Sequence, residues 1–113
     1  MPIIRAFFLT AVLISAVAFS PLAGAQVDED AAVSLAKKGN CFKCHAIDKR
    51  KKAPSYKDIA KRYAGKPNAE REVFLHITGN PVVKLDEGEE KHIAPETRNE
   101  QELYNLVRWI LSQ

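Results

Sequence analysis

The sequence predicts an all-α domain built from about four short helices. Four segments place apolar residues at the i, i+3, i+4 spacing of an amphipathic helix, and capping residues, glycines or dipole-matched charges bound them. No two segments show the alternation expected of a pair of strands, although residues 82–85 suit a short extended piece. Residues 80–98 lack periodicity, and a loop of that length in a small domain is usually functional.

The first helix is expected over about residues 29–39. Acidic side chains lie at its start and lysines at its end, as the helix dipole favours, and Gly39 terminates it. The second helix is expected over about residues 55–64, where Ser55 is a suitable N-cap.

The third helix is expected over about residues 68–78, with a glycine directly after it. The fourth is expected over about residues 99–111, where Asn99 and Glu102 resemble a capping box. Its apolar stripe consists of Leu103, Leu106, Val107, Ile110 and Leu111.

Residues 1–25 have the pattern of a cleaved secretory signal peptide. Arg5 precedes an apolar run over residues 7–19, and small residues at 23–25 form a cleavage site. A retained membrane anchor is the alternative, but the run is shorter than the ~20 residues that a spanning helix needs. We therefore expect export to the periplasm, a mature domain of residues 26–113 and no stable membrane insertion.

Charge is distributed unevenly along the expected mature domain. Residues 37–66 hold eleven Lys or Arg against two acidic residues, whereas residues 67–113 hold five basic and nine acidic residues. Such a basic segment can bind nucleic acid, but an exported protein rarely meets any, so we expect no nucleic-acid partner. The segment is either a solvated face or a docking face for an acidic protein partner.

Both cysteines lie in residues 41–45, Cys-Phe-Lys-Cys-His, and C-x-x-C-H is the attachment pattern of a covalent haem. Each thiol adds to one haem vinyl group and forms a thioether. Two intervening residues let the backbone arch so that the sulfurs of Cys41 and Cys44 reach the same haem edge. The next residue, His45, is then carried under the ring as an axial ligand of the iron.

Three other interpretations of the motif are weaker. A thioredoxin-like dithiol belongs to an α/β domain, which this pattern does not predict. A zinc site would use Cys41, Cys44, His45 and either His76 or His92, but adjacent Cys44 and His45 would strain a tetrahedral site. A disulfide would close only a tiny ring and leave the histidine unexplained.

Beyond the motif, the chain resembles the short bacterial class I cytochromes c, which are monohaem periplasmic electron carriers. Residues 35–40 (LAKKGN) resemble that family's entry into the haem motif, and residues 106–113 (LVRWILSQ) are close to its final helix. Residues 53–60 (APSYKDIA) are similar to its G-P-x-Y-x-x-x-A stretch, with Ala53 where glycine is usual. The resemblance covers essentially all of residues 26–113.

This resemblance implies a class I cytochrome c fold around one covalent haem and a one-electron carrier between redox proteins. It also implies roles for single residues. The Pro54 carbonyl would accept a hydrogen bond from His45 and orient its ring. His76 would lie near a haem propionate, and Trp109 would lie where the first and last helices meet.

One position departs from the family. Its members carry a methionine before the last helix as the second axial ligand, whereas the only methionine here is Met1. His92 falls within a residue or so of the expected position. Two other residues are weaker candidates for the sixth ligand. His76 lies on a patterned helix, which would have to be redirected over the haem. Lys91 would first have to lose a proton, and the ordinary pKa of a lysine is ~10.4. We therefore expect bis-histidine ligation by His45 and His92 and a lower reduction potential.

A vacant or weakly held sixth position would instead suit a haem-based sensor or a binder of NO or CO. We expect no enzymatic activity, because nothing in the chain resembles the distal acid–base groups of a peroxidase. Lys43 and the basic residues 49–52 are expected to surround the haem edge and to favour acidic redox partners.

Overall fold

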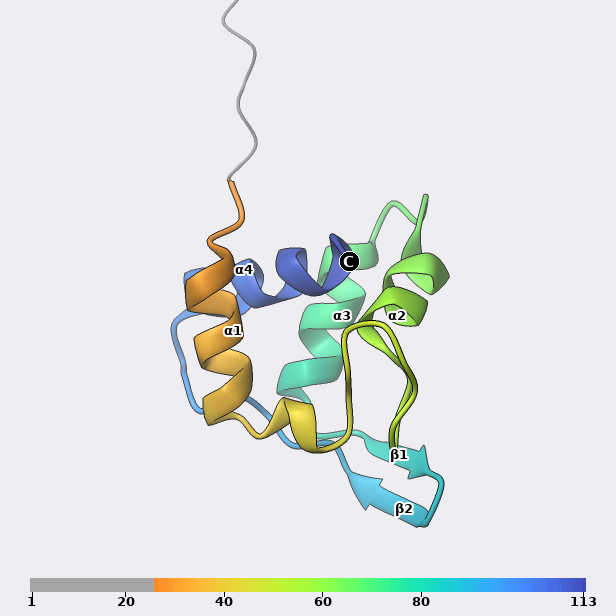
Figure 1. Ribbon diagram of the computed structural model, residues 1–113. Coiled ribbons are helices and arrows are strands. Elements are labelled where there is room, and N and C mark those ends of the chain that lie inside the picture. The colour runs from red at the N-terminus through yellow and green to blue at the C-terminus, as the bar shows by residue number, and fades with distance from the viewer. Residues whose placement is uncertain (1–25) are drawn as a thin grey trace, which may run out of the picture.

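The computed structural model describes residues 26–113, so the expected signal peptide, residues 1–25, lies outside the described residues. The elements, in chain order, are α1 (Glu29–Lys38), η1 (Cys41–Lys43), α2 (Tyr56–Tyr63), α3 (Ala69–Thr78), β1 (Val82–Leu85), β2 (Gly88–Lys91) and α4 (Glu100–Leu111). Figure 1 shows the α-helices grouped together and the small hairpin at the end of the domain opposite the C-terminus. Within this part of the chain, no helix is long and apolar enough to cross a membrane.

The start of α2 uses the cap that the sequence predicts, because Ser55 Oγ accepts from the Asp58 N–H at 3.1 Å. At the start of α1, where only dipole-matched acidic residues were expected, Asp28 Oδ1 accepts from the Ala31 N–H at 3.0 Å. Asn105 on α4 joins the start of α1, because its side chain bonds both the N–H and the carbonyl of Asp28 at 2.8 Å. This pair of bonds fixes the first helix against the last.

The cap of α4 differs in detail from the expected capping box. Asn99 Oδ1 accepts from the N–H groups of Gln101 and Glu102. In a capping box the Glu102 side chain would itself accept from the Asn99 N–H. Here Thr97 lies between them: its hydroxyl accepts from the Asn99 N–H at 3.1 Å and donates to Glu102 at 2.7 Å. The helix start therefore depends on three side chains rather than two.

The core lies along α4, which contacts α1, α2 and α3. Its apolar stripe supplies Leu106 and Val107, which are almost completely buried, together with Trp109. The other helices contribute mainly small and branched residues. The buried core cluster consists of Ala32, Leu35, Ala36, Tyr56, Val73, Ile77, Leu103, Leu106, Val107, Trp109 and Ile110.

The expectation of no strand pair was wrong. β1 and β2 form an antiparallel hairpin in which Val82 faces Lys91 and Leu85 faces Gly88, joined by the two-residue turn Asp86–Glu87. All four β2 residues are exposed, so no apolar alternation marks this strand. The predicted fold class is confirmed all the same, because the domain is mostly helical with four α-helices.

The Asn99 cap can be tested by truncation. Replacing Asn99 with Ala should lower the free energy of unfolding by about 1 kcal/mol, because two helix N–H groups lose their acceptor. Urea denaturation followed by far-UV circular dichroism would measure the change. The matched control is Asn68→Ala, since Asn68 precedes α3 but its side chain makes no capping hydrogen bond. Equal losses in the two variants would contradict a specific capping role for Asn99.

Candidate haem site

The segment from Gly39 to His45 turns both thiols and one imidazole toward the same cavity. Asn40 adopts the left-handed conformation (φ 57°), and the His45 N–H donates to the Cys41 carbonyl at 3.0 Å. Gly39 allows a close approach, because a Cβ there would lie 3.4 Å from Cys41 Sγ, the Leu35 carbonyl oxygen and Pro95 Cα. Both cysteines are free thiols, so neither is consumed in a disulfide.

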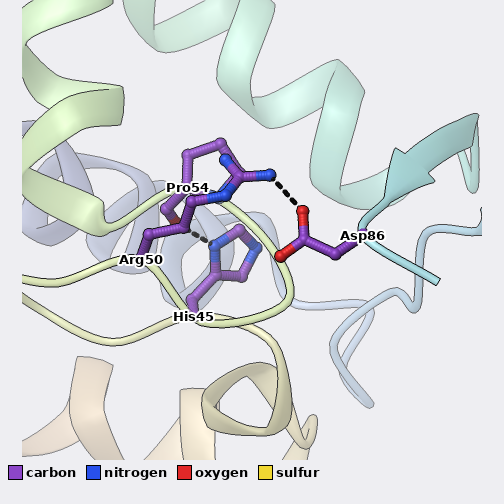
Figure 2. Close-up of polar contacts among 4 residues, drawn as sticks. All are labelled: His45, Arg50, Pro54 and Asp86. Carbon is purple, nitrogen blue, oxygen red and sulfur yellow. Dashed lines mark hydrogen bonds and ion pairs between the residues drawn. The ribbon is translucent and has the colours of Figure 1, made fainter.

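His45 is held in one orientation by two contacts. Its Nδ1 donates to the Pro54 carbonyl at 2.6 Å, as Figure 2 shows. A carbonyl only accepts, so Nδ1 carries the proton and Nε2 is left to bind a metal. The Tyr56 ring stacks on the imidazole at 5.1 Å with an interplanar angle of 21°. Burial lowers the pKa of His45, and the Pro54 carbonyl partly opposes the shift, so the ring is neutral at neutral pH.

The cavity beside His45 has a volume of about 410 Å³. Cofactor sites span about 300–1,000 Å³ and have mainly apolar walls. Here α2, α3, α4 and the hairpin supply those walls. The apolar lining includes Ile59, Val73, Ile77, Val83, Leu85, Leu106 and Ile110. Two thiols, an oriented imidazole and this apolar cavity together fit a covalently attached haem.

His92 lies across the cavity from the motif. Its ring centre is 6.3 Å from that of His45, with an interplanar angle of 49°. Its Nδ1 is buried without a hydrogen-bond partner among the described residues. Burial lowers the pKa of His92 to about 4, with His76 and His45 adding to the shift and the Ile93 backbone opposing it. The imidazole is therefore neutral near pH 7, as a metal ligand must be.

His76 and Trp109, the other two residues to which the resemblance gives roles, differ in their relation to the cavity. His76 lines the cavity from α3, and its ring meets the His92 ring at 4.7 Å and 66°. Burial, followed by the charges of His45 and Arg62, lowers the pKa of His76. Trp109 is not among the residues that line the cavity. It packs edge-on against Tyr56 at 5.3 Å and Phe42 at 6.3 Å.

Two ion pairs connect the segment after the haem motif to the hairpin turn. Arg50 contacts Asp86 at 2.7 Å, and Lys52 contacts Glu87 at 3.6 Å. Figure 2 shows the Arg50–Asp86 pair beside His45 and Pro54. Sequence reasoning missed these contacts, because opposite charges about 35 residues apart carry no local signal. We call these two pairs the hairpin clasp.

The alternative uses of the cysteines do not fit this geometry. Among residues 26–113, no group of three or more His, Cys, Asp or Glu side chains is placed to hold a metal ion, which argues against a zinc site. The mostly helical fold is also unlike the α/β context of a thioredoxin-like dithiol.

Comparison with known proteins decides the family. Residues 30–113 match the cytochrome c family model. The chain belongs to the cytochrome c family. Cytochrome c-551 of Pseudomonas aeruginosa is 36% identical to it over 91 residues, covering 75% of this chain and 78% of that protein. Cytochrome c-552 of Hydrogenobacter thermophilus is 31% identical over 80 residues, covering 69% of this chain and 76% of that protein.

Solved structures agree with this assignment. The class 1 cytochrome MtoD of Sideroxydans lithotrophicus ES-1 is similar, with a TM-score of 0.73 and 46% identity over 77% of this chain and 97% of that chain. Nitrosomonas europaea cytochrome c552 gives a TM-score of 0.56 and 29% identity over 71% and 96%. The protein is thus a monohaem class I cytochrome c, a small electron carrier and not an enzyme, and bacterial class I cytochromes are typically periplasmic.

The C-x-x-C-H motif of this cytochrome, Cys41, Cys44 and His45, implies one covalent haem c, which the two cysteines would hold and to which His45 would offer its imidazole. Bound there, the haem supplies a one-electron ferric/ferrous couple. The protein orients the imidazole of His45 through Pro54 and lines the cavity with apolar walls, and His92 lines the same cavity. Its partners are redox proteins.

Proposed function

We propose that this cytochrome is an exported one-electron carrier in which His45 and His92 bind the haem iron from opposite faces. The observation that carries the proposal is the 6.3 Å separation of the two imidazole centres across the cavity. A metal–imidazole bond is about 2 Å long, and the ring centre lies about 1 Å beyond the bound nitrogen. Two imidazoles on opposite sides of one iron therefore have centres about 6 Å apart.

The protonation state of His92 also supports ligation. A protonated imidazole has no lone pair to offer, and a pKa of about 4 keeps His92 neutral at physiological pH. The neighbouring Lys91 is exposed, and an ammonium group would have to lose its proton before it could bind iron. His92 is thus the better distal ligand, in both position and charge state.

Two consequences follow for function. Replacing the thioether of the usual methionine with a second imidazole should lower the reduction potential, since Met/His ligation raises it. A distal histidine already at the iron also closes the sixth position to small ligands. The protein should therefore act as a carrier rather than as a sensor of NO or CO.

Replacing the distal histidine tests the ligand assignment. In His92→Met, a sulfur ligand should raise the potential and produce a sulfur-to-iron charge-transfer band. In His92→Ala, the open iron should become high-spin when ferrous and bind CO, as the sensor hypothesis would require of the wild type. Optical spectra and redox titration would measure both changes. His76→Ala is the control, and the assignment is wrong if this variant, and not His92→Ala, loses the low-spin spectrum.

We also propose that residues 1–25 are removed on export and that residues 26–113 form the periplasmic protein. The pattern of a basic start, an apolar run and small residues supports it. Denaturing mass spectrometry of the protein expressed with a haem-attachment system should give a chain starting near Gln26 plus one haem. A mass that includes residues 1–25, found in the membrane fraction, would favour a retained anchor.

Exposed lysines beside the haem motif support the proposal that the redox partner has an acidic docking face. Lys43 lies within the haem motif and Lys49 just after it, and both are exposed. Neither makes an ion pair within residues 26–113, whereas Arg50 and Lys52 of the same segment are engaged in the hairpin clasp. The positive charge that is not paired beside the motif is therefore smaller than the sequence count suggests. Lys43 and Lys49 are the better candidates for steering an acidic partner toward the haem site.

Charge reversal at Lys43 tests this steering. Lys43→Glu should slow oxidation of the ferrous protein by the anion ferricyanide by about twofold to fivefold at low salt. The difference should fade as salt shortens the screening length to about 3 Å at 1 M. Stopped-flow absorbance at several ionic strengths would measure the rates. The matched control is Arg71→Glu, which makes the same change of charge on α3, outside residues 43–52. Equal slowing in both variants would show that the rate depends on net charge alone and not on the position of Lys43.

A further inference from the structure

The main chain of His92 is tied on both sides to the residues that follow α3. Its N–H donates to the Pro81 carbonyl at 2.7 Å. Its carbonyl accepts from the side-chain amide of Asn80 at 2.9 Å. These two bonds close the open end of the hairpin, opposite its turn. The backbone that carries the proposed distal ligand is therefore anchored to the two residues that lie between Gly79, the cap of α3, and β1.

Asn80 has the conformation that this anchor needs. It adopts a left-handed backbone (φ 50°), which asparagine tolerates better than other residues with a Cβ. Gly79 precedes it and bonds the Leu75 carbonyl at 2.9 Å to end α3. A Cβ on Gly79 would lie only 2.7 Å from that carbonyl oxygen, so a residue with a side chain would disturb this helix end. The Asn80 amide is thus presented from a well-defined helix end.

The same helix also contacts the ring of His92. His76, one turn before Asn80, places its own ring against the His92 imidazole in an edge-to-face arrangement. The distal histidine is therefore contacted at two levels: by His76 of α3 at the side chain, and by Asn80, which follows α3, at the backbone. The backbone bonds fix where the His92 side chain starts, and the His76 ring packs against the imidazole that it carries.

We propose that Asn80 is a positioning residue for the distal histidine: its amide locks the His92 backbone to α3 and so sets how readily His92 leaves the iron. The inference rests on the proposed ligation by His92. A two-stranded hairpin is only marginally stable by itself. Its turn is held by exposed ion pairs, which contribute little. The hydrogen bonds at its open end involve the His92 backbone itself and can resist its departure.

Removal of the Asn80 amide should accelerate release of His92. In Asn80→Gly the left-handed backbone stays relaxed while the donor is lost. Imidazole should then displace His92 from the ferric protein about twofold to fivefold faster, the factor expected of one exposed hydrogen bond. Asn80→Asp, which has the same shape but no donor at this position, should behave alike. Stopped-flow absorbance at saturating imidazole would give the release rate.

Electron paramagnetic resonance of the ferric protein supplies a second readout. The g-values of a low-spin bis-imidazole centre depend on the angle between the two rings, so a loosened His92 should shift or broaden them. The matched control is Asn105→Ala, which removes the two hydrogen bonds to Asp28 between α1 and α4. It should lower the unfolding midpoint while leaving the release rate and the g-values unchanged.

Two distinct results would overturn the proposal. If Asn80→Gly and Asn80→Asp keep the wild-type release rate and g-values while His92→Ala opens the iron, His92 is the ligand but Asn80 does not position it. If His92→Ala itself keeps the low-spin spectrum, the ligand assignment fails and the role of Asn80 fails with it. Faster release in both Asn80 variants, with Asn105→Ala unchanged, supports the proposal.

Discussion

The hydrogen bond from His45 Nδ1 to the Pro54 carbonyl is the contact around which the site is arranged. It spans nine residues and closes the loop that joins the haem motif to α2. Because it fixes which nitrogen carries the proton, it also fixes which nitrogen faces the cavity. Ser55, the next residue, caps α2, so the same turn orients the proximal ligand and starts the helix that supplies a cavity wall.

The two sides of the cavity are stabilised in different ways. On the side of the motif, Tyr56 packs against Trp109 of α4, and both belong to the main core. On the side of His92, the hairpin has one apolar face, formed by Val83 and Leu85, and these side chains line the cavity. A domain of this size buries only a modest fraction of its surface, so its core cannot stabilise every wall of the cavity. The hairpin side therefore depends on polar contacts and on the group that fills the cavity.

The helices and the proximal half of the site were predictable, because their signals are local. Caps such as Ser55 act within one helical turn, and the C-x-x-C-H spacing itself determines which groups can meet. The hairpin was not predictable. β2 reads Gly-Glu-Glu-Lys, with poor β propensity and no buried face, and its two-residue turn Asp86–Glu87 lacks the usual glycine within the turn. Its position depends on Arg50, which is 36 residues from Asp86 in sequence, and on hydrogen bonds that join Asn80 and Pro81 to the His92 main chain, which no local pattern indicates.

The hairpin clasp has a consequence for biogenesis. Arg50 and Lys52 follow the attachment motif directly, and their partners Asp86 and Glu87 lie at the tip of the hairpin that forms another wall of the same cavity. A rigid macrocycle cannot thread between walls that are already joined. Because both pairs are exposed and contribute little, the clasp can open at small energetic cost. The walls of the cavity can therefore part to admit a haem, and the clasp can form again once the cavity is filled.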